Sequence, residues 1–209
     1  MANEKNNILD EVANYYTAKL SEHGETPHGV DWNGEAGQSL RFKQLSKIIT
    51  TENRFSINDI GCGFGSLHDY LTSNYQDFSY FGVDISKEMI LTAEQRYKDN
   101  KNTHFIIGDK PNHIADYSVA SGIFNVCQTR SKKEWSEYIN SNLDILDKNS
   151  KLGFAFNCLT SYSDADKMKD YLYYADPCIL FDKCKKSYSK NVTLLHDYDL
   201  YEFTILVRK

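Results

Sequence analysis

The chain has 209 residues, of which 41% are hydrophobic and 25% charged, and this composition is typical of one globular domain. Its formal net charge is −5, so it lacks the surplus of positive charge with which proteins bind a nucleic-acid backbone. The polar start of the chain does not resemble a secretory signal, and no run approaches the ~20 apolar residues of a membrane span, so we expect a cytoplasmic protein.

The first 50 residues predict a helical cap. Apolar residues recur near one face of a predicted helix over residues 1–20 and of a second one over residues 36–50. Residues 21–34 between them are rich in Gly, Pro and Asn, which indicates a loop. The loop nevertheless carries Trp32, and a large aromatic side chain in a loop either packs on the domain or awaits a ligand.

Strands and helices alternate after the cap. The predicted strands of this part are residues 55–59, 78–84, 104–109, 117–121 and 152–157. Residues 160–190 form an insertion, and strands over 192–196 and 202–207 then follow one another without a helix. Alternation predicts right-handed βαβ units and a mostly parallel sheet, whereas the helix-free ending makes the last strand antiparallel. The predicted fold is therefore an α/β domain with seven strands and helices on both faces of the sheet.

A glycine-rich turn follows the first strand. The run Asp59-Ile60-Gly61-Cys62-Gly63-Phe64-Gly65 lets a ligand lie against bare backbone at the start of a helix. It differs from the dinucleotide fingerprint G-x-G-x-x-G by one residue in the last interval. Asp84 ends the second strand, where an acid can accept hydrogen bonds from ribose hydroxyls. Asp109 ends the third strand, where a carboxylate can accept from an adenine amino group.

These features resemble the class I S-adenosylmethionine-dependent methyltransferases. The glycine run is similar to the first motif of that family, residues 81–89 to the second, and residues 107–109 to its adenine position. The resemblance covers residues 54–209, with a core over 54–159, and implies a Rossmann-like fold. It also implies S-adenosylmethionine as cofactor, with the glycines near its methionine part. The cofactor-binding residues expected from it are Asp59, Gly61, Cys62, Gly63, Gly65, Asp84, Ile85, Met89, Gly108, Asp109, Ser121 and, by its charge, Arg41.

The methyl acceptor is predicted to be a small molecule. The end of the fourth strand lacks the Asn-Pro-Pro-aromatic signature of family members that methylate amino groups of nucleic acids, and the chain is acidic. In the family, aromatic insertions like residues 160–190 help to build the acceptor site. The residues expected near the acceptor are Tyr16, Asp31, Trp32, Ile123, Phe124, Asn125, Asn157 and Tyr162.

Two histidines are candidates for a general base. A hydroxyl acceptor must lose its proton, and histidine titrates nearest to neutral pH. His28 lies in the cap loop and His196 near the end of the sixth strand, and each is equally well explained as a structural residue. An amine acceptor would need only its neutral form, and a carboxylate acceptor no base. No Cys/His cluster has ligand spacing, so a metal is not expected.

Other functions remain open at the level of the sequence. A non-catalytic module that binds S-adenosylmethionine would carry the same motifs, and the acceptor could be a protein or RNA. A nicotinamide-dependent oxidoreductase is disfavoured by the glycine interval and by the absence of a second substrate domain. The sequence does not indicate the oligomeric state.

Overall fold

A computed structural model describes the backbone of residues 2–209 and the side chains of residues 8–209. None of the helices in this range is long and apolar enough to cross a membrane. In chain order the elements are α1 (Ala2–His23), the 3-10 helix η1 (Pro27–Val30), α2 (Glu35–Ser46), β1 (Phe55–Ile60), α3 (Ser66–Asn74), β2 (Phe78–Asp84), α4 (Lys87–Arg96), β3 (Thr103–Ile107), β4 (Ala115–Ala120), α5 (Lys132–Lys148), β5 (Ser150–Leu159), α6 (Pro177–Ser187), β6 (Asn191–Leu195) and β7 (Glu202–Arg208).

One seven-stranded sheet has the order β3-β2-β1-β4-β5-β7-β6. The pairs among β1 to β5 are parallel, and β7 runs antiparallel to both β5 and β6. The predicted Rossmann-like fold with an antiparallel last strand is thus confirmed. The chain leaves β1 in one direction towards β2 and β3, and returns to β4 on its other side. The carboxyl ends of β1 and β4 therefore flank a topological switch point, where open α/β sheets bind ligands.

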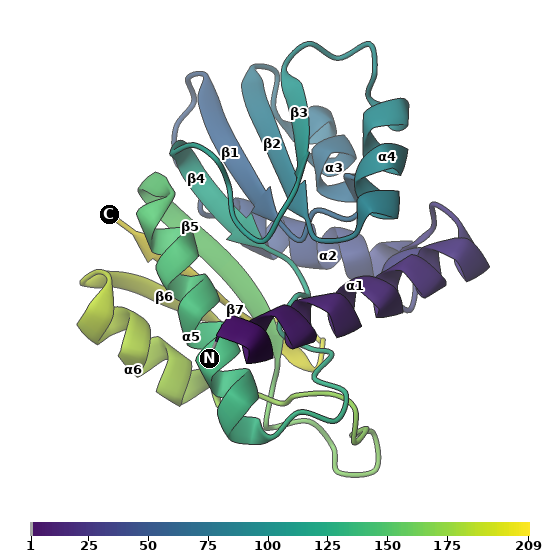
Figure 1. The fold of residues 1–209 in the computed structure, drawn as a ribbon. Helices are drawn as coiled ribbons and strands as arrows, with labels where there is room; N and C mark the ends of the chain where they lie inside the picture. Colours follow the sequence, from purple (N-terminus) through teal and green to yellow (C-terminus); the bar gives the residue numbers. More distant parts are fainter. Residues whose placement is uncertain (1) are drawn as a thin grey trace.

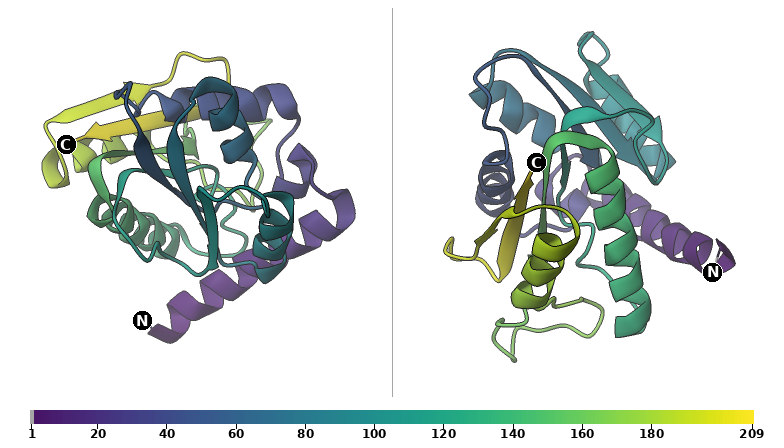
Figure 2. Two further views of the ribbon diagram at one scale, coloured as in Figure 1. Left: turned by 90° about the horizontal axis from the view of Figure 1, so that it is seen from above. Right: turned by 90° about the vertical axis from the view of Figure 1, so that its left-hand side faces the viewer.

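Helices cover the sheet in two layers. Figures 1 and 2 show α2, α3 and α4 on one face, while α5 and α6 lie on the other. The first layer packs on a core cluster that includes Phe55, Ile57 and Tyr80, and the second on a cluster that includes Trp135 and Phe156. Alternate residues of each strand supply the two clusters, as the period of two in a β-strand requires. This packing fixes where the strand ends lie.

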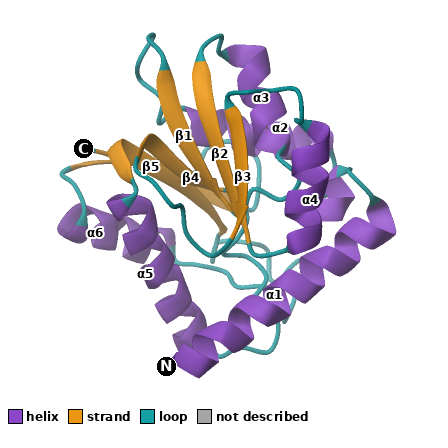
Figure 3. Ribbon diagram, turned by 45° about the horizontal axis from the view of Figure 1, so that its top comes forward, coloured by secondary structure: helices purple, strands orange, loops and turns teal. Residues whose placement is uncertain are grey.

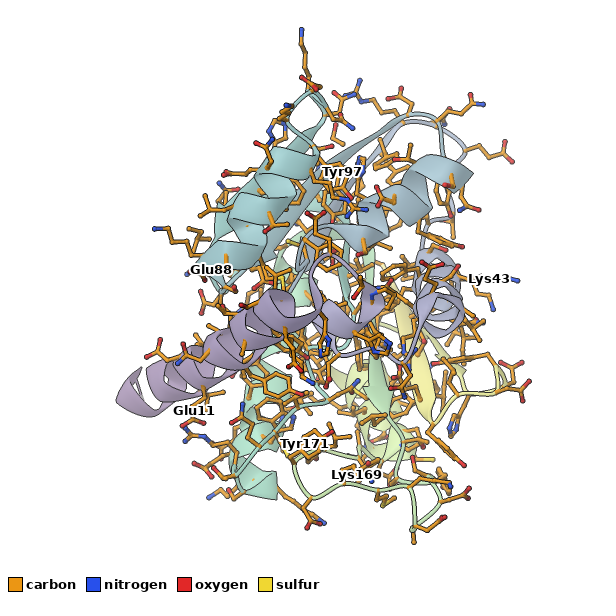
Figure 4. The ribbon with its side chains drawn as sticks, turned by 90° about the vertical axis from the view of Figure 1, so that its right-hand side faces the viewer. Glu11, Lys43, Glu88, Tyr97, Lys169 and Tyr171 are labelled. Atoms are coloured by element: carbon orange, nitrogen blue, oxygen red, sulfur yellow. The ribbon has the colours of Figure 1, made fainter. Side chains whose placement is uncertain are left out.

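Helix α1 runs past the carboxyl ends of the strands (Figures 1 and 3). The Thr17 hydroxyl lies 2.9 Å from the Ser86 hydroxyl, just before α4, and the Arg130 guanidinium binds the Glu11 carboxylate at 2.6 Å. In Figure 4, α1 lies between the segment that carries Glu88 and the segment that carries Tyr171. The N-terminal helix thus closes one side of the switch point.

Residues 160–190 contain more regular structure than an insertion was expected to have. Their second half forms α6, which begins with Pro177 after the N-cap residue Asp176. The Asp176 carboxylate accepts hydrogen bonds from the N–H groups of Cys178 at 2.8 Å and Ile179 at 3.2 Å, which starts the helix. Because α6 packs against β6 and β7, it is the crossover between β5 and β6. The irregular parts are residues 160–176 and 188–190.

Candidate active site

A cavity lies at the carboxyl ends of β1, β2 and β4, with α1, η1 and α2 around it. It contains about 990 Å³ of space free of protein atoms, part of which opens to solvent. Most of the residues predicted to bind a cofactor line it. They are Asp59, Gly61, Cys62, Gly63, Asp84, Ile85, Met89, Gly108, Asp109 and Ser121.

The glycine turn presents backbone to the cavity. Gly61 has φ 73° and Gly63 φ 55°, both in the left-handed region that favours glycine. A Cβ atom on Gly61 would lie 2.1 Å from Cγ2 of Ile123, so a side chain there does not fit. The N–H groups of Gly61 and Cys62 donate to the Val83 carbonyl at 2.8 and 3.1 Å, which ties the turn to β2. Gly65 caps α3 and does not line the cavity.

Asp84 is held at the wall of the cavity by backbone donors. The N–H of Gly63 donates to its Oδ2 at 2.9 Å, and the N–H of Ser86 donates to its Oδ1 at 2.8 Å. Burial raises the pKa of Asp84, and these backbone hydrogen bonds oppose the shift. The carboxylate is therefore fixed in position before any ligand arrives.

Asp59 and Ser121 each place a buried polar atom at the cavity without a protein partner. Tyr80 donates its hydroxyl proton to Oδ2 of Asp59 at 2.5 Å, whereas Oδ1 has no hydrogen-bond partner. The Oγ of Ser121 has none either. Burial raises the pKa of Asp59 to about 7, against the opposing effect of the Tyr80 hydrogen bond. Buried polar atoms are normally hydrogen-bonded, so both atoms mark positions where a ligand donor or acceptor fits.

Part of the predicted acceptor region also lines the cavity. Tyr16 from α1, Trp32 from the cap loop and Ile123 after β4 all reach it. Further lining residues were not predicted from the sequence: Leu9, Val12, Val30, Gln38, Phe42, Tyr138 and Asn142. Several share helical spacing, such as Leu9, Val12 and Tyr16 on α1, but an apolar stripe that faces a cavity has the same pattern as one that faces a core.

Four residues predicted near the acceptor lie elsewhere in the structure. Phe124 and Asn157 are fully buried, and Oδ1 of Asn125 accepts a hydrogen bond from the N–H of Leu159 at 3.0 Å. Tyr162 is 67% exposed. None of these four side chains lines the cavity. The aromatic insertion therefore contributes no side chain to the described cavity wall.

Asp31 supports the cap instead of facing the cavity. Tyr15 donates its hydroxyl proton to Oδ2 of Asp31 at 2.7 Å, and the Lys19 ammonium lies 3.0 Å from Oδ1. Burial raises the pKa of Tyr15, and the hydrogen bond to Asp31 and the negative charge of Asp31 raise it further. These contacts fasten the loop that carries Trp32 to α1.

The two candidate bases and Arg41 do not line the cavity. His28 is exposed, with its ring 5.9 Å from that of His23, and His196 is also exposed, in the turn between β6 and β7. The Arg41 guanidinium binds the carboxylate of Glu202 instead. Among the side chains that the structure describes, no three of His, Cys, Asp or Glu are grouped as metal ligands.

Comparison with known proteins places this geometry among methyltransferases. The family model described as "Methyltransferase domain" matches residues 57–149. Rv1506c of Mycobacterium tuberculosis, provisionally named a methyltransferase, is 55% identical over 163 residues, which cover 78% of this chain and 98% of that protein.

Solved structures share the fold at low sequence identity. The complex of DhpI with SAH has a TM-score of 0.64 at 14% identity and covers 95% of each chain. Magnesium protoporphyrin IX methyltransferase from Synechocystis PCC 6803, solved with bound SAH, has a TM-score of 0.63 at 13% identity. That match covers 83% of this chain and 84% of the other.

Proposed function

The chain belongs to the class I S-adenosylmethionine-dependent methyltransferases, and from this premise we propose that it methylates a small-molecule acceptor. One observation carries the proposal. The glycine turn, Asp84, Asp109 and the unpartnered Oδ1 of Asp59 meet in a single cavity, and α1 and Trp32 border the same space. In our proposal the cofactor takes one part of this cavity and the acceptor takes the part beside α1 and Trp32.

The residues of the cavity fit S-adenosylmethionine. Asp84 and Asp109 line it together with Asp59, and ionised carboxylates favour the positive charges of the sulfonium and ammonium groups. In our proposal Asp84 binds the ribose hydroxyls, Asp109 the adenine edge, and the backbone of residues 61–63 the methionine part. When bound, S-adenosylmethionine supplies a methyl group on a positively charged sulfur.

The protein contributes alignment and exclusion of water. An in-line displacement needs the acceptor atom opposite the leaving sulfur, and holding two reactants in that geometry is a large part of catalysis. The fixed glycine turn and the fixed Asp84 orient one reactant. Helix α1 runs past the carboxyl ends of the strands (Figure 3), and in our proposal it and the cap loop exclude water once both reactants are bound. Because neither His28 nor His196 reaches the cavity, the proposed transfer relies on alignment and uses neither histidine as a base.

Several features support a small acceptor. The entrance is bordered by α1, η1 and α2, with apolar and aromatic lining residues such as Val12, Tyr16, Trp32 and Phe42. A macromolecular substrate would need an open surface, and a nucleic acid would need positive charge, whereas the chain carries a net charge of −5. The cap instead favours a molecule that can be enclosed.

Calorimetric titration tests the cofactor assignment. We expect S-adenosylmethionine and S-adenosylhomocysteine each to bind in a 1:1 complex, and NADH to give no heat. Binding of NADH alone would contradict the proposal.

The acceptor class is tested by incubating the protein with a cell extract and methyl-labelled S-adenosylmethionine. We expect the filtrate of an ultrafiltration membrane to contain a protein-dependent labelled compound that chromatography separates from S-adenosylmethionine, whereas transferred label retained with protein or RNA would contradict a small acceptor.

A further inference from the structure

Trp32 is held in the wall of the cavity by contacts on its face and its edge. The guanidinium carbon of Arg41 lies 4.0 Å from the centroid of the indole ring, in cation–π geometry. The edge of the ring packs on Gly122, where a Cβ atom would lie 2.4 Å from Cζ2 of Trp32. The position of the indole therefore depends on the Arg41 guanidinium and on the absence of a side chain at Gly122.

Arg41 is in turn oriented by Glu202, the first residue of β7. Its Nε donates to Oε1 of Glu202 at 2.9 Å and its Nη2 donates to the same atom at 2.7 Å. Asn157 donates from Nδ2 to Oε2 of Glu202 at 2.8 Å, and its Oδ1 accepts from the N–H of Gly122 at 2.8 Å. The contacts form a closed ring, which we call the indole clamp: Trp32, Arg41, Glu202, Asn157 and Gly122.

The Arg41–Glu202 pair is better suited to orienting the Trp32 indole than to stabilising the fold. Glu202 is only 1% exposed, and a buried ion pair gains little over apolar residues of similar size because both charges lose water. A planar guanidinium, however, can bind a carboxylate along its edge and stack on an aromatic face at the same time. The pair therefore defines one orientation of the indole, which an apolar pair would not.

The position of Trp32 along the sheet distinguishes it from the cofactor residues. Asp84 ends β2 and Asp109 follows β3, on one side of the glycine turn after β1. Trp32 contacts Gly122, which follows β4, on the other side of that turn. The indole thus borders the part of the cavity farthest from the acids that we assign to ribose and adenine.

We propose that Glu202 is a positioning residue for the methyl acceptor, because through Arg41 it sets the Trp32 indole as the wall on which an uncharged, flat or apolar part of the acceptor packs. This inference rests on the proposed function. It makes the terminal β6–β7 hairpin part of the acceptor site although Glu202 does not line the cavity.

Tryptophan quenching by acrylamide tests the clamp without a known acceptor. The chain has two tryptophans, and Trp135 is 1% exposed, so acrylamide reports mainly on Trp32; Trp32→Phe verifies this assignment. We expect Glu202→Gln to raise the quenching constant of Trp32 and to leave the S-adenosylhomocysteine affinity within about threefold of the wild type. Glu11→Gln is the control, since the Glu11 carboxylate likewise binds an arginine, Arg130, and it should leave quenching unchanged.

A second variant covers the case in which Glu202→Gln does not fold. The double change Arg41→Met with Glu202→Leu removes both charges together, which avoids an unpaired buried charge, and it should raise Trp32 quenching in the same way. Unchanged quenching in the folded variants would overturn the proposal. So would a loss of S-adenosylhomocysteine affinity as large as that of Asp84→Asn, because the pair would then serve the cofactor. Failure of the wild type to bind the cofactor would instead contradict the proposed function, and the quenching result would stand separately.

Discussion

The backbone N–H of Gly63 donates a hydrogen bond to Oδ2 of Asp84 over 2.9 Å, which joins the turn after β1 to the end of β2. The left-handed φ of 55° at Gly63 directs this N–H towards the acid. Two motifs that lie apart in the sequence thus form one rigid unit. The cofactor site is consequently organised in the free protein, and binding energy is not spent on ordering it.

Asp84→Asn should weaken S-adenosylhomocysteine binding without unfolding the domain. The amide keeps the shape and one oxygen but loses the charge, and a hydrogen bond to a charged group contributes ~1.5–3 kcal/mol, or roughly 10- to 150-fold in affinity. Calorimetry gives the affinity and thermal denaturation checks the fold. Asp77→Asn is the control, because Asp77 is exposed and contacts Arg54. Unchanged affinity in Asp84→Asn would refute the ribose assignment.

Asp59→Asn should change how stability depends on pH. Burial raises the pKa of Asp59 to about 7 in the folded state, so the unfolded chain releases this proton first as pH rises. The stability that the protonated acid contributes is full below the unfolded pKa and is lost as pH rises towards 7. Asparagine does not ionise, so the variant does not lose this stability as pH rises. From about pH 5 to about pH 8, its unfolding free energy should gain roughly 2–4 kcal/mol relative to the wild type.

Urea denaturation of both proteins at several pH values measures this difference. Asp116→Asn is an informative control, because hydrogen bonds from Ser56 lower the pKa of that acid in spite of burial. Its variant should lose stability relative to the wild type as pH rises, the opposite sign. A stability difference for Asp59→Asn that does not depend on pH would show that Asp59 is ionised throughout.

The sequence was sufficient to predict which residues meet at the carboxyl ends of β1 and β2, because backbone geometry defines this part of the cavity. Three glycines after a strand and an acid at the end of the next strand form a pattern that few other sites share, and the parallel order of β1 and β2 brings them together. Helix α6 was not predicted, although Asp176 followed by Pro177 is a helix-start pattern. The many aromatic residues of that segment favoured an acceptor-site insertion, and aromatic content does not distinguish a packed helix from a binding loop.

The acceptor half was harder to predict because it depends on which buried groups face a cavity. Asn157 lies near the end of β5 and Asn125 in the segment after β4, where functional polar residues occur, yet both satisfy buried groups of the protein itself. Arg41 was expected to meet a ligand carboxylate, but it binds Glu202, which is far away in sequence. A sequence pattern gives the residue type and the strand end, and it does not give the partner that a side chain finds across the fold.

Gly122→Ala should displace the Trp32 indole. Gly122 has φ 79°, and its Cβ would meet Cζ2 of Trp32 at 2.4 Å, so both backbone and side chain must move. Strain and overpacking of this kind cost ~1–3 kcal/mol each, and the quenching of Trp32 should rise. Gly24→Ala is a matched control, because Gly24 has φ 64° and nothing within 4 Å of a new Cβ. A Gly122 variant as stable as the control, with unchanged quenching, would show that the indole does not pack there.

Asp31→Asn should loosen the cap. Asparagine tolerates the left-handed φ of 60° at this position, so the backbone is preserved while the contact with Lys19 loses its charge. A partly exposed pair of this kind contributes ~0.2–1 kcal/mol, which corresponds to an increase of up to about fivefold in the open population. We expect faster proteolysis within residues 10–35 of the free variant. S-adenosylhomocysteine should slow cleavage in both proteins, because Tyr16 and Trp32 border the cavity to which we assign it. Glu22→Gln, on an exposed part of α1, should cleave like the wild type. Cleavage that is equally fast with and without S-adenosylhomocysteine would show that the cap does not close on the ligand.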